Sequence, residues 1–278
     1  MANKQINELT EKSATLADDD LILVYDSEEA GSEKAKKVAI SNYVATINSP
    51  VTLYVDPAGN DTTGDGSIGN PWATPNKAYE WLGNKYLSAT VTIQCADGTY
   101  SMSSSTLKIN HMQGNLIKLY GNTGTPSNCV FDFPQADTGF KSIVSVDYGC
   151  MFQVFGVKFT IPNTTNNPIG IDSTPNSIIR FNNSILDGFY YGILNTSSRL
   201  TATSSIITNC DKYGVAGFRN ADQYLASCTI SNTADVGAFS AYRSFTRLNN
   251  ITFSGNNTNT SPANDTVGNS ESYMIITT

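Results

Sequence analysis

A repeat of about two dozen residues runs through the last two thirds of this chain and limits what it can fold into. Five short segments recur 21 to 27 residues apart: Val157-Lys158-Phe159, Ser184-Ile185-Leu186, Ser205-Ile206-Ile207, Cys228-Thr229-Ile230 and Ile251-Thr252-Phe253. A second series keeps the same phase, with 22 or 23 residues between its glycines: Gly170-Ile171, Gly192-Ile193, Gly214-Val215 and Gly237-Ala238. Two signals with one period predict stacked coils, because a single coil cannot bury its apolar face alone.

The residues between these signals favour strands and turns. No helix-length 3.6-residue period appears after Val91, and the repeat has the length of three strands plus turns. Asparagine recurs near the expected strand ends, for example at Asn183, Asn209 and Asn232, and it tolerates the left-handed backbone of tight turns. We therefore predict that residues 91–276 form one stack, in which the residues that end the five triplets share one interior column.

Composition excludes several classes of function. The chain has 278 residues, of which 15% are charged, and a net charge of −7, which argues against a nucleic-acid partner. No apolar run approaches 18 residues, so we expect no membrane insertion. The first 15 residues are polar, and we expect no signal peptide. The five cysteines lack a CxxC spacing or a histidine partner, so we expect buried thiols in a protein folded in reducing cytosol, with no metal and no cofactor.

Residues 1–49 have the pattern of a separate small α+β module. A strand is expected at Leu21–Tyr25 and a return strand at Val38–Ile40, followed by a short helix that Ser41 caps and that runs through Tyr43 and Val44 to Ile47. A lone hairpin with one helix buries little apolar surface, which indicates docking or oligomerisation.

Residues 50–278 form the second expected domain, which opens with a loop and helix over 50–88. Thr74 is a suitable N-cap and Pro75 suits the first helical position. We predict a helix over Pro75–Leu82 that covers the first coil, with Trp81 and Leu82 facing inward. An uncovered coil would expose its core to water.

The stretch Tyr54-Val55-Asp56, Gly59-Asn60-Asp61, Gly64-Asp65-Gly66 and Pro71-Trp72-Ala73-Thr74 resembles the opening of pectate-lyase-like right-handed parallel β-helix proteins. The front of the chain, Ile6-Asn7-Glu8-Leu9-Thr10 and Leu16-Ala17-Asp18 through Tyr25-Asp26, is similar to N-terminal segments of bacteriophage tail fibres and tailspikes. These resemblances imply a virion-attachment module at 1–49, which binds a phage tail or baseplate protein, and a right-handed parallel β-helix body. They also imply a homotrimer. An apolar surface that includes Phe189, Tyr190 and Phe245 would need such covering.

Two aspartates are the candidate catalytic residues. Aligning the coils by their period places Asp147, Asp172 and Asn195 at one strand-end position, with neighbouring coils about 4.8 Å apart. Two carboxylates at that distance raise one another's pKa and could act as acid and nucleophile on a sugar bond. The alternative is that both are turn residues that cap backbone amides. The calcium cluster and partnered base of the lyases have no counterpart among the acids and the few basic residues of the coils.

Aromatic side chains are the candidate glycan contacts. Tyr148, Phe218 and Tyr242 lie just past the ladder position, and Asn195 could add a hydrogen bond. Sugar rings stack on such faces. The alternative is that these aromatics belong to the core or to a trimer interface.

These patterns favour a structural protein of a phage tail fibre or tailspike, located in the virion tail after assembly in the host cytoplasm, that binds a host surface glycan. The alternatives are a depolymerase, which would be a glycoside hydrolase acting on surface polysaccharide, and a virion decoration protein without a receptor.

Overall fold

The computed structural model describes residues 21–25, 35–39, 45–83, 85–102, 106–133, 142–162, 167–263 and 272–277. The chain divides into two compact units, one of residues 1–46 with 84–86 and one of residues 47–83 with 87–278.

The first unit contains an antiparallel pair of strands. β1 (Leu21–Tyr25) pairs with β2 (Ala35–Ala39), with Leu21 opposite Ala39. The predicted hairpin is therefore confirmed, although its second strand begins earlier than Val38. The helix expected after Ser41 begins outside the described residues, and Ile47, expected at its end, lies instead in a two-residue strand, β3 (Thr46–Ile47), which pairs with β5 (Tyr86–Leu87).

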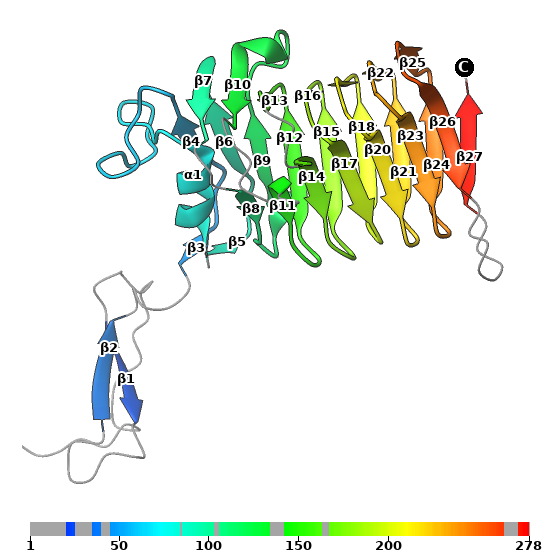
Figure 1. Ribbon diagram of the computed structural model, residues 1–278. Coiled ribbons are helices and arrows are strands. Elements are labelled where there is room, and N and C mark those ends of the chain that lie inside the picture. The colour runs from blue at the N-terminus through cyan, green and yellow to red at the C-terminus, as the bar shows by residue number, and fades with distance from the viewer. Residues whose placement is uncertain are drawn as a thin grey trace, which may run out of the picture. The chain divides into compact units, whose positions relative to one another are not determined.

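The second unit is a parallel β-helix with three sheets, and the predicted fold class is confirmed (Figure 1). In spatial order, the β4–β27 sheet comprises β4 (Val51–Val55), β6 (Val91–Cys95), β9 (Ile117–Tyr120), β12 (Met151–Phe155), β15 (Ile178–Asn182), β18 (Arg199–Thr203), β21 (Asp222–Ala226), β24 (Phe245–Asn249) and β27 (Tyr273–Thr277). The β7–β25 sheet comprises β7 (Gly98–Ser101), β10 (Cys129–Asp132), β13 (Lys158–Thr160), β16 (Ile185–Asp187), β19 (Ile206–Thr208), β22 (Thr229–Ser231) and β25 (Thr252–Ser254). The β8–β26 sheet comprises β8 (Leu107–Ile109), β11 (Ser142–Val146), β14 (Ile169–Ser173), β17 (Tyr191–Thr196), β20 (Tyr213–Phe218), β23 (Val236–Ala241) and β26 (Thr258–Ala263).

The repeated triplets form one interior column, as predicted. In the β7–β25 sheet Phe159 pairs with Leu186, and the column continues through Ile207 and Ile230 to Phe253. The first four side chains are fully buried, while Phe253 in the last coil is half-buried. Each coil thus places one apolar side chain on that of the coil before, which removes both from water.

At the glycine series in the β8–β26 sheet, the backbone of the next coil leaves no room for a side chain. Gly170, Gly192, Gly214 and Gly237 occupy successive rungs. A Cβ atom added at Gly192 would lie 2.4 Å from the carbonyl oxygen of Gly214. No side chain fits at that distance, so the period of the glycines is a steric requirement of the stack.

Residues with positive φ turn the chain at the corners between sheets. The corner after the β4–β27 sheet uses Gly156, Asn183, Ser204, Ser227 and Asn250, with φ between 47° and 70°. The corner after the β7–β25 sheet uses Gly188, Asn209, Asn232 and Gly255. Glycine and asparagine adopt this left-handed conformation at the lowest cost. The expectation that asparagines near strand ends serve this role is confirmed at Asn183, Asn209, Asn232 and Asn250.

Helix α1 (Pro75–Leu82) packs against the first coils, where its cap was predicted. The Thr74 hydroxyl accepts a hydrogen bond from the Lys77 amide, Pro75 opens the helix and Gly83 ends it. Contacts run from α1 to β4, β6 and β8. The side chains of Pro75, Ala78, Tyr79 and Leu82 are buried.

The inward orientation predicted for Trp81 is wrong. Its side chain is 36% exposed, and its ring lies 5.9 Å from the buried ring of Trp72. The apolar stripe of the helix follows i, i+3, i+4 and i+7 from Pro75, so Tyr79 takes the inward position and Trp81 falls at the edge of the stripe.

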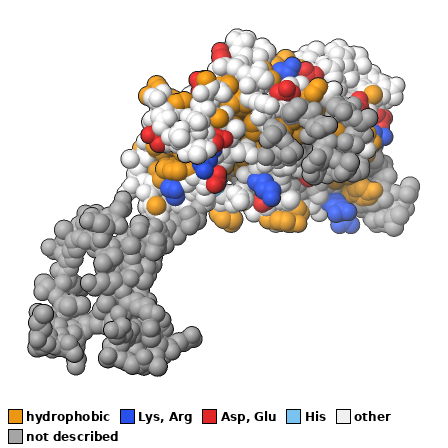
Figure 2. Space-filling view, turned by 60° about the vertical axis from the view of Figure 1, so that its left-hand side comes forward, with side chains coloured by type: hydrophobic (Ala, Val, Ile, Leu, Met, Phe, Trp, Pro, Cys, Tyr) orange, Lys and Arg blue, Asp and Glu red, His pale blue; other side chains and the backbone are white. Residues whose placement is uncertain are grey.

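The exposed position expected for Phe189 is also wrong, because this side chain is fully buried. Tyr190 and Phe245 are half-buried. On the face shown in Figure 2, hydrophobic side chains form separate patches among polar ones. In the described part of the chain no helix combines the length and the apolar character needed to cross a membrane.

We expect Ile207→Asp to destabilise the protein by more than about 3 kcal/mol, because it places an unpaired carboxylate in the interior column. Ile206→Asp is the matched control, since the neighbouring side chain points outward and is 40% exposed. Chemical denaturation monitored by circular dichroism measures both changes. Equal losses of stability in the two variants would contradict the assignment of the interior column.

Candidate functional site

The strand register separates the three residues that were expected at one ladder position. Asp172 pairs with Ser145 in the preceding coil and with Leu194 in the following coil. Asn195 pairs with Ser173 instead, and Asp147 lies beyond the end of β11. The predicted alignment of Asp147, Asp172 and Asn195 is therefore wrong. Its source is the uneven length of the turns that lead into this sheet.

Asn195 is a structural residue of the interior. Its side chain is fully buried, its Oδ1 accepts hydrogen bonds from the hydroxyls of Ser173 and Ser198, and its Nδ2 donates to the Ser198 carbonyl at 3.3 Å. These bonds satisfy the polar groups where the chain turns out of β17. The predicted glycan contact at Asn195 is incompatible with this burial.

Asp172 is a half-buried carboxylate on the outer face of the β8–β26 sheet. Burial raises its pKa, and a backbone hydrogen bond at Ser173 offsets only part of the effect. Its neighbours across the strands are the small Ser145 and the apolar Leu194. A carboxyl group in such a position is suited to exchange a proton or to accept hydrogen bonds from a ligand that replaces water.

Asp147 lies one coil away from Asp172 and two residues further along the strand direction. This offset corresponds to roughly 8 Å between the two Cα atoms. The Ser145 hydroxyl donates to Asp147 Oδ1 at 3.4 Å, and the next residue, Tyr148, is 66% exposed.

Six aromatic rings form a continuous cluster over the C-terminal coils of the same sheet. We call them the aromatic platform, and its members are Tyr190, Tyr191, Tyr213, Phe218, Phe239 and Tyr242. Tyr213 and Phe239 stack with ring centroids 4.4 Å apart and planes 2° from parallel. Phe218 lies 5.5 Å from Phe239 and 6.1 Å from Tyr242.

The aromatic platform is partly exposed to solvent, and its rings are held by contacts with their neighbours. Tyr242 is 47% exposed and the other five residues are half-buried. Burial and the neighbouring Tyr190 and Tyr213 raise the pKa of Tyr191, so its hydroxyl is neutral at physiological pH. The Lys212 ammonium pairs with Asp235 and lies 5.3 Å from the centre of the Tyr213 ring.

The register brings together two of the three predicted aromatic contacts. Phe218 and Tyr242 belong to the platform, whereas Tyr148 lies in an earlier coil. The prediction gave no role to Phe239, although this residue comes two positions after Gly237 of the glycine series. Alternation from Gly192 and Gly214 places the preceding Tyr191 and Tyr213 on the outer face, so their signal was available in the sequence. Phe239 lies on a different rung, with Leu194 and Ala216, and alternation from Gly237 does not predict its outward position.

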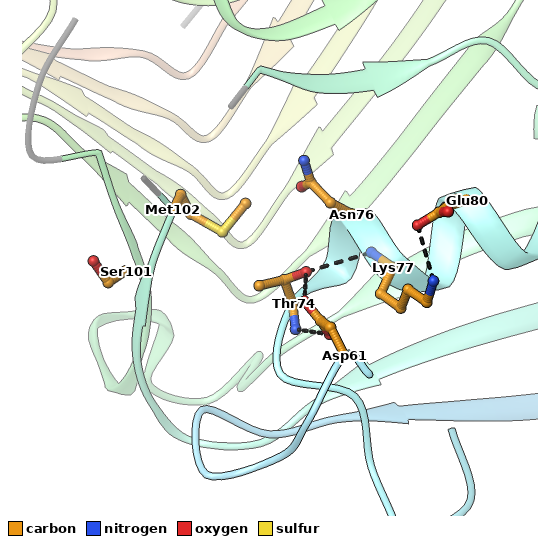
Figure 3. A pocket seen from close by; sticks show the side chains of 7 residues that line it. All are labelled: Asp61, Thr74, Asn76, Lys77, Glu80, Ser101 and Met102. Atoms are coloured by element: carbon orange, nitrogen blue, oxygen red, sulfur yellow. Dashed lines mark hydrogen bonds and ion pairs between the residues drawn. The ribbon is translucent and has the colours of Figure 1, made fainter. Parts of the chain in front are cut away.

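A cleft with a volume of about 290 Å³ lies beside helix α1 (Figure 3). Asp61, Thr74, Asn76, Lys77 and Glu80 line one side of it, and Ser101 and Met102 lie on the other. Lys77 pairs with Glu80 at 3.1 Å. Asp61 accepts hydrogen bonds from the amides of Ala73 and Thr74 and from the Thr74 hydroxyl, so its two oxygens hold the loop onto the helix start.

The residues of the loop before α1 do not fit a calcium site. Asp56, Asn60 and Asp65 each accept a hydrogen bond from a backbone amide two residues further on. These contacts form Asx-turns. Across the described ranges, no group of three or more His, Cys, Asp or Glu side chains is arranged to hold a metal ion. The five cysteines are buried free thiols.

No family model matches this chain, and no curated protein matches it. Among solved structures it is similar to a rhamnogalacturonan lyase, with a TM-score of 0.40 and 14% identity over 81% of this chain. It is also similar to the pectate lyase Pel9A, with a TM-score of 0.46 and 16% identity over 85% of this chain. The aligned parts cover 66% and 63% of those two structures, respectively.

We expect Asp172→Asn to stabilise the protein at neutral pH. A carboxyl group whose pKa is raised by folding is disfavoured in its charged form, so its cost is absent below the unfolded value of 3.8 and develops as the pH rises through the folded value. The amide removes that cost. Thermal unfolding of both proteins should therefore give a higher melting temperature for the variant at pH 7 and similar temperatures at pH 3. A lower melting temperature at pH 7 would contradict the burial of this carboxylate.

Proposed function

We propose that this protein binds an extended surface polysaccharide along the outer face of the β8–β26 sheet. The observation that carries the proposal is the aromatic platform. Six rings on successive strands offer flat apolar surfaces that can stack against sugar rings, and the tyrosine hydroxyls can hydrogen-bond to sugar hydroxyls. Clustered aromatic rings that stay partly open to solvent favour a binding surface over a core role.

The shape of the sheet supports a long, repetitive ligand. Neighbouring strands lie about 4.8 Å apart, so contacts recur at short, regular intervals along the stack. A polymer that lies along the axis meets a new strand at each step. A compact ligand would be better served by a deep pocket.

The proposed setting is the tail of a bacteriophage, and this rests on the resemblance of the front of the chain. In this setting a homotrimer carries residues 1–49 as the attachment module, which binds a tail or baseplate protein, and the β-helix contacts a host glycan. The protein would be assembled in the host cytoplasm and function in the virion. A virion decoration protein without a receptor remains the non-binding alternative.

A depolymerase is the second candidate function, and Asp172 is the observation that favours it. Its raised pKa suits a general acid, and Asp147, just past the end of β11 in the preceding coil, could serve as the second carboxylate of an inverting reaction. In this reading Asp172 protonates the leaving oxygen, while Asp147 removes a proton from the attacking water. The separation of the two residues by the strand register leaves simple binding as the better-supported proposal.

We expect Tyr213→Ala and Phe239→Ala to weaken binding to the recognised polysaccharide about five- to tenfold each, because each removes a stacking surface. Affinity electrophoresis in gels that contain candidate host polysaccharides measures this change. Tyr120→Ala is the matched control, since Tyr120 stacks with Phe155 at 4.5 Å on the β4–β27 sheet. Equal loss in all three variants would contradict a site on the platform. If the parent protein releases reducing ends from the polysaccharide and Asp172→Asn does not, the depolymerase reading replaces simple binding.

We expect a protein lacking residues 1–49 to keep its β-helix, because the interior columns lie entirely within the second unit. The shortened protein should be missing from purified virions when it replaces the full-length form during infection. Circular dichroism checks the fold, and immunoblotting of particles checks incorporation. Incorporation of the shortened protein at the full-length level would reject the attachment role.

A further inference from the structure

All five arginines of the chain lie on one surface of the β-helix. Arg180, Arg199 and Arg247 occupy outward positions of β15, β18 and β24, respectively, and all three are exposed. Arg219 and Arg243 lie at the adjoining corner, where the chain passes from the β8–β26 sheet to the β4–β27 sheet, and they are exposed too. We call these five residues the arginine strip. The protein as a whole has a net charge of −7, so this surface departs from the rest of the molecule.

Few acidic groups offset the strip. Asp222 lies 3.3 Å from Arg247 and 3.7 Å from Arg199. Arg180 donates to the Gln153 side chain at 3.3 Å. Among the described residues, the guanidinium groups of Arg219 and Arg243 have no hydrogen bond or ion pair within the chain. Both have the donors for a ligand still available.

The backbone at the corner is strained in a way that the other corners avoid. Arg219, Tyr242 and Arg243 have φ values of 54°, 53° and 63°, in the left-handed region. At every other described position with positive φ the residue is Gly, Asn or Ser. A long side chain in this conformation costs stability, and such outliers are found where a side chain serves a function. At these three positions of the corner, asparagine would adopt the left-handed backbone at a lower cost in stability than arginine or tyrosine.

The strained arginines lie between the aromatic platform and a groove. Arg219 follows Phe218 of the platform directly, and Arg243 follows Tyr242. On the other side, Arg199 and Asn220 help to line a shallow groove of about 300 Å³. A polymer stacked on the platform would therefore place its side groups within reach of the corner.

We propose that the polysaccharide bound by this protein is anionic, and that Arg219 and Arg243 bind its acidic groups at the corner beside the aromatic platform. This inference rests on the proposed glycan binding and names the chemical class of the glycan. A planar guanidinium group with a fixed fork of donors matches a carboxylate, sulfate or phosphate oxygen pair, which an ammonium group does not. Successive coils repeat the cations along the axis, as a chain with acidic groups on successive sugars requires.

The test uses the full-length protein and four probes: polygalacturonate, heparin, neutral dextran and single-stranded oligothymidylate. The double variant Arg219→Asn/Arg243→Asn should weaken binding to at least one acidic polysaccharide by about tenfold or more, with a reduced dependence on salt. Its melting temperature should stay the same or rise, because asparagine relieves the left-handed strain. The combination of lost binding and retained stability distinguishes a ligand-binding role from a structural one.

The double variant Lys77→Asn/Lys118→Asn removes the same charge on α1 and β9, outside the β8–β26 sheet, and should leave binding unchanged. Glycan binding that depends on Tyr213 but not on the two arginines would overturn this inference and leave the proposed function intact. Binding to none of the polysaccharides would reject both. Tighter, arginine-dependent binding to oligothymidylate than to any polysaccharide would also overturn the inference, because it would identify a nucleic acid as the ligand.

Discussion

The stacking of like positions at the strand spacing is the constraint on which the rest of this structure depends. Each coil can bury its apolar side chains only when they meet those of the coils before and after it, so the column from Phe159 to Phe253 fixes the period of the chain. The same spacing forbids a Cβ atom at Gly170, Gly192 and Gly214, where carbonyl oxygens of the next coil approach. Apolar burial in the β7–β25 sheet and steric exclusion at the glycines of the β8–β26 sheet therefore impose the same repeat length on the chain.

This constraint acts on the inside of the coils and leaves the outside free to vary. The inward columns hold mostly aliphatic and aromatic residues, with buried polar groups around Asn195 at one corner and at Gln223 and Thr246, which hydrogen-bond to each other. The outward positions carry different chemistry on each sheet. On the β7–β25 sheet, Lys158 pairs with Asp187 at 2.7 Å. Burial acts to raise the pKa of Asp187, but the hydrogen bonds from Lys158 and Asn209 outweigh burial, and the pKa is lowered. On the β8–β26 sheet the outward positions hold Asp172 and the aromatic platform instead.

The proposed binding surface lies at the one corner of the coils where residues other than Gly, Asn and Ser adopt positive φ. Two corners of each coil are turned by Gly, Asn or Ser, which satisfy the left-handed backbone at low cost. The third corner accepts Arg219, Tyr242 and Arg243 in that conformation, beside the aromatic rings and at the edge of the arginine strip. Strain, stacking surface and positive charge come together at one edge of the molecule. Each has a physical reason to be there if an anionic glycan lies across that edge.

The sequence by itself determined the repeat, the interior column, the glycine rungs, the left-handed asparagines and the cap of helix α1. All of these follow from local chemistry or from a period that the chain displays directly. The glycine series also indicated the correct pairing of Asp172. Asp172 lies two residues after Gly170 and Leu194 lies two residues after Gly192, and these two residues pair. The prediction followed a different alignment and paired Asp172 with Asn195.

Only the tertiary structure decided which side chains share a rung after turns of unequal length. The turn from β13 to β14 is several residues longer than the turn from β16 to β17, so counting from the triplets does not carry the register into the next sheet. The hydrogen bonding of the buried Asn195 likewise depends on Ser173 of the preceding coil, together with the local Ser198. The gathering of five arginines on one surface arises from the coiling itself, because residues more than twenty positions apart become neighbours only when the coils stack.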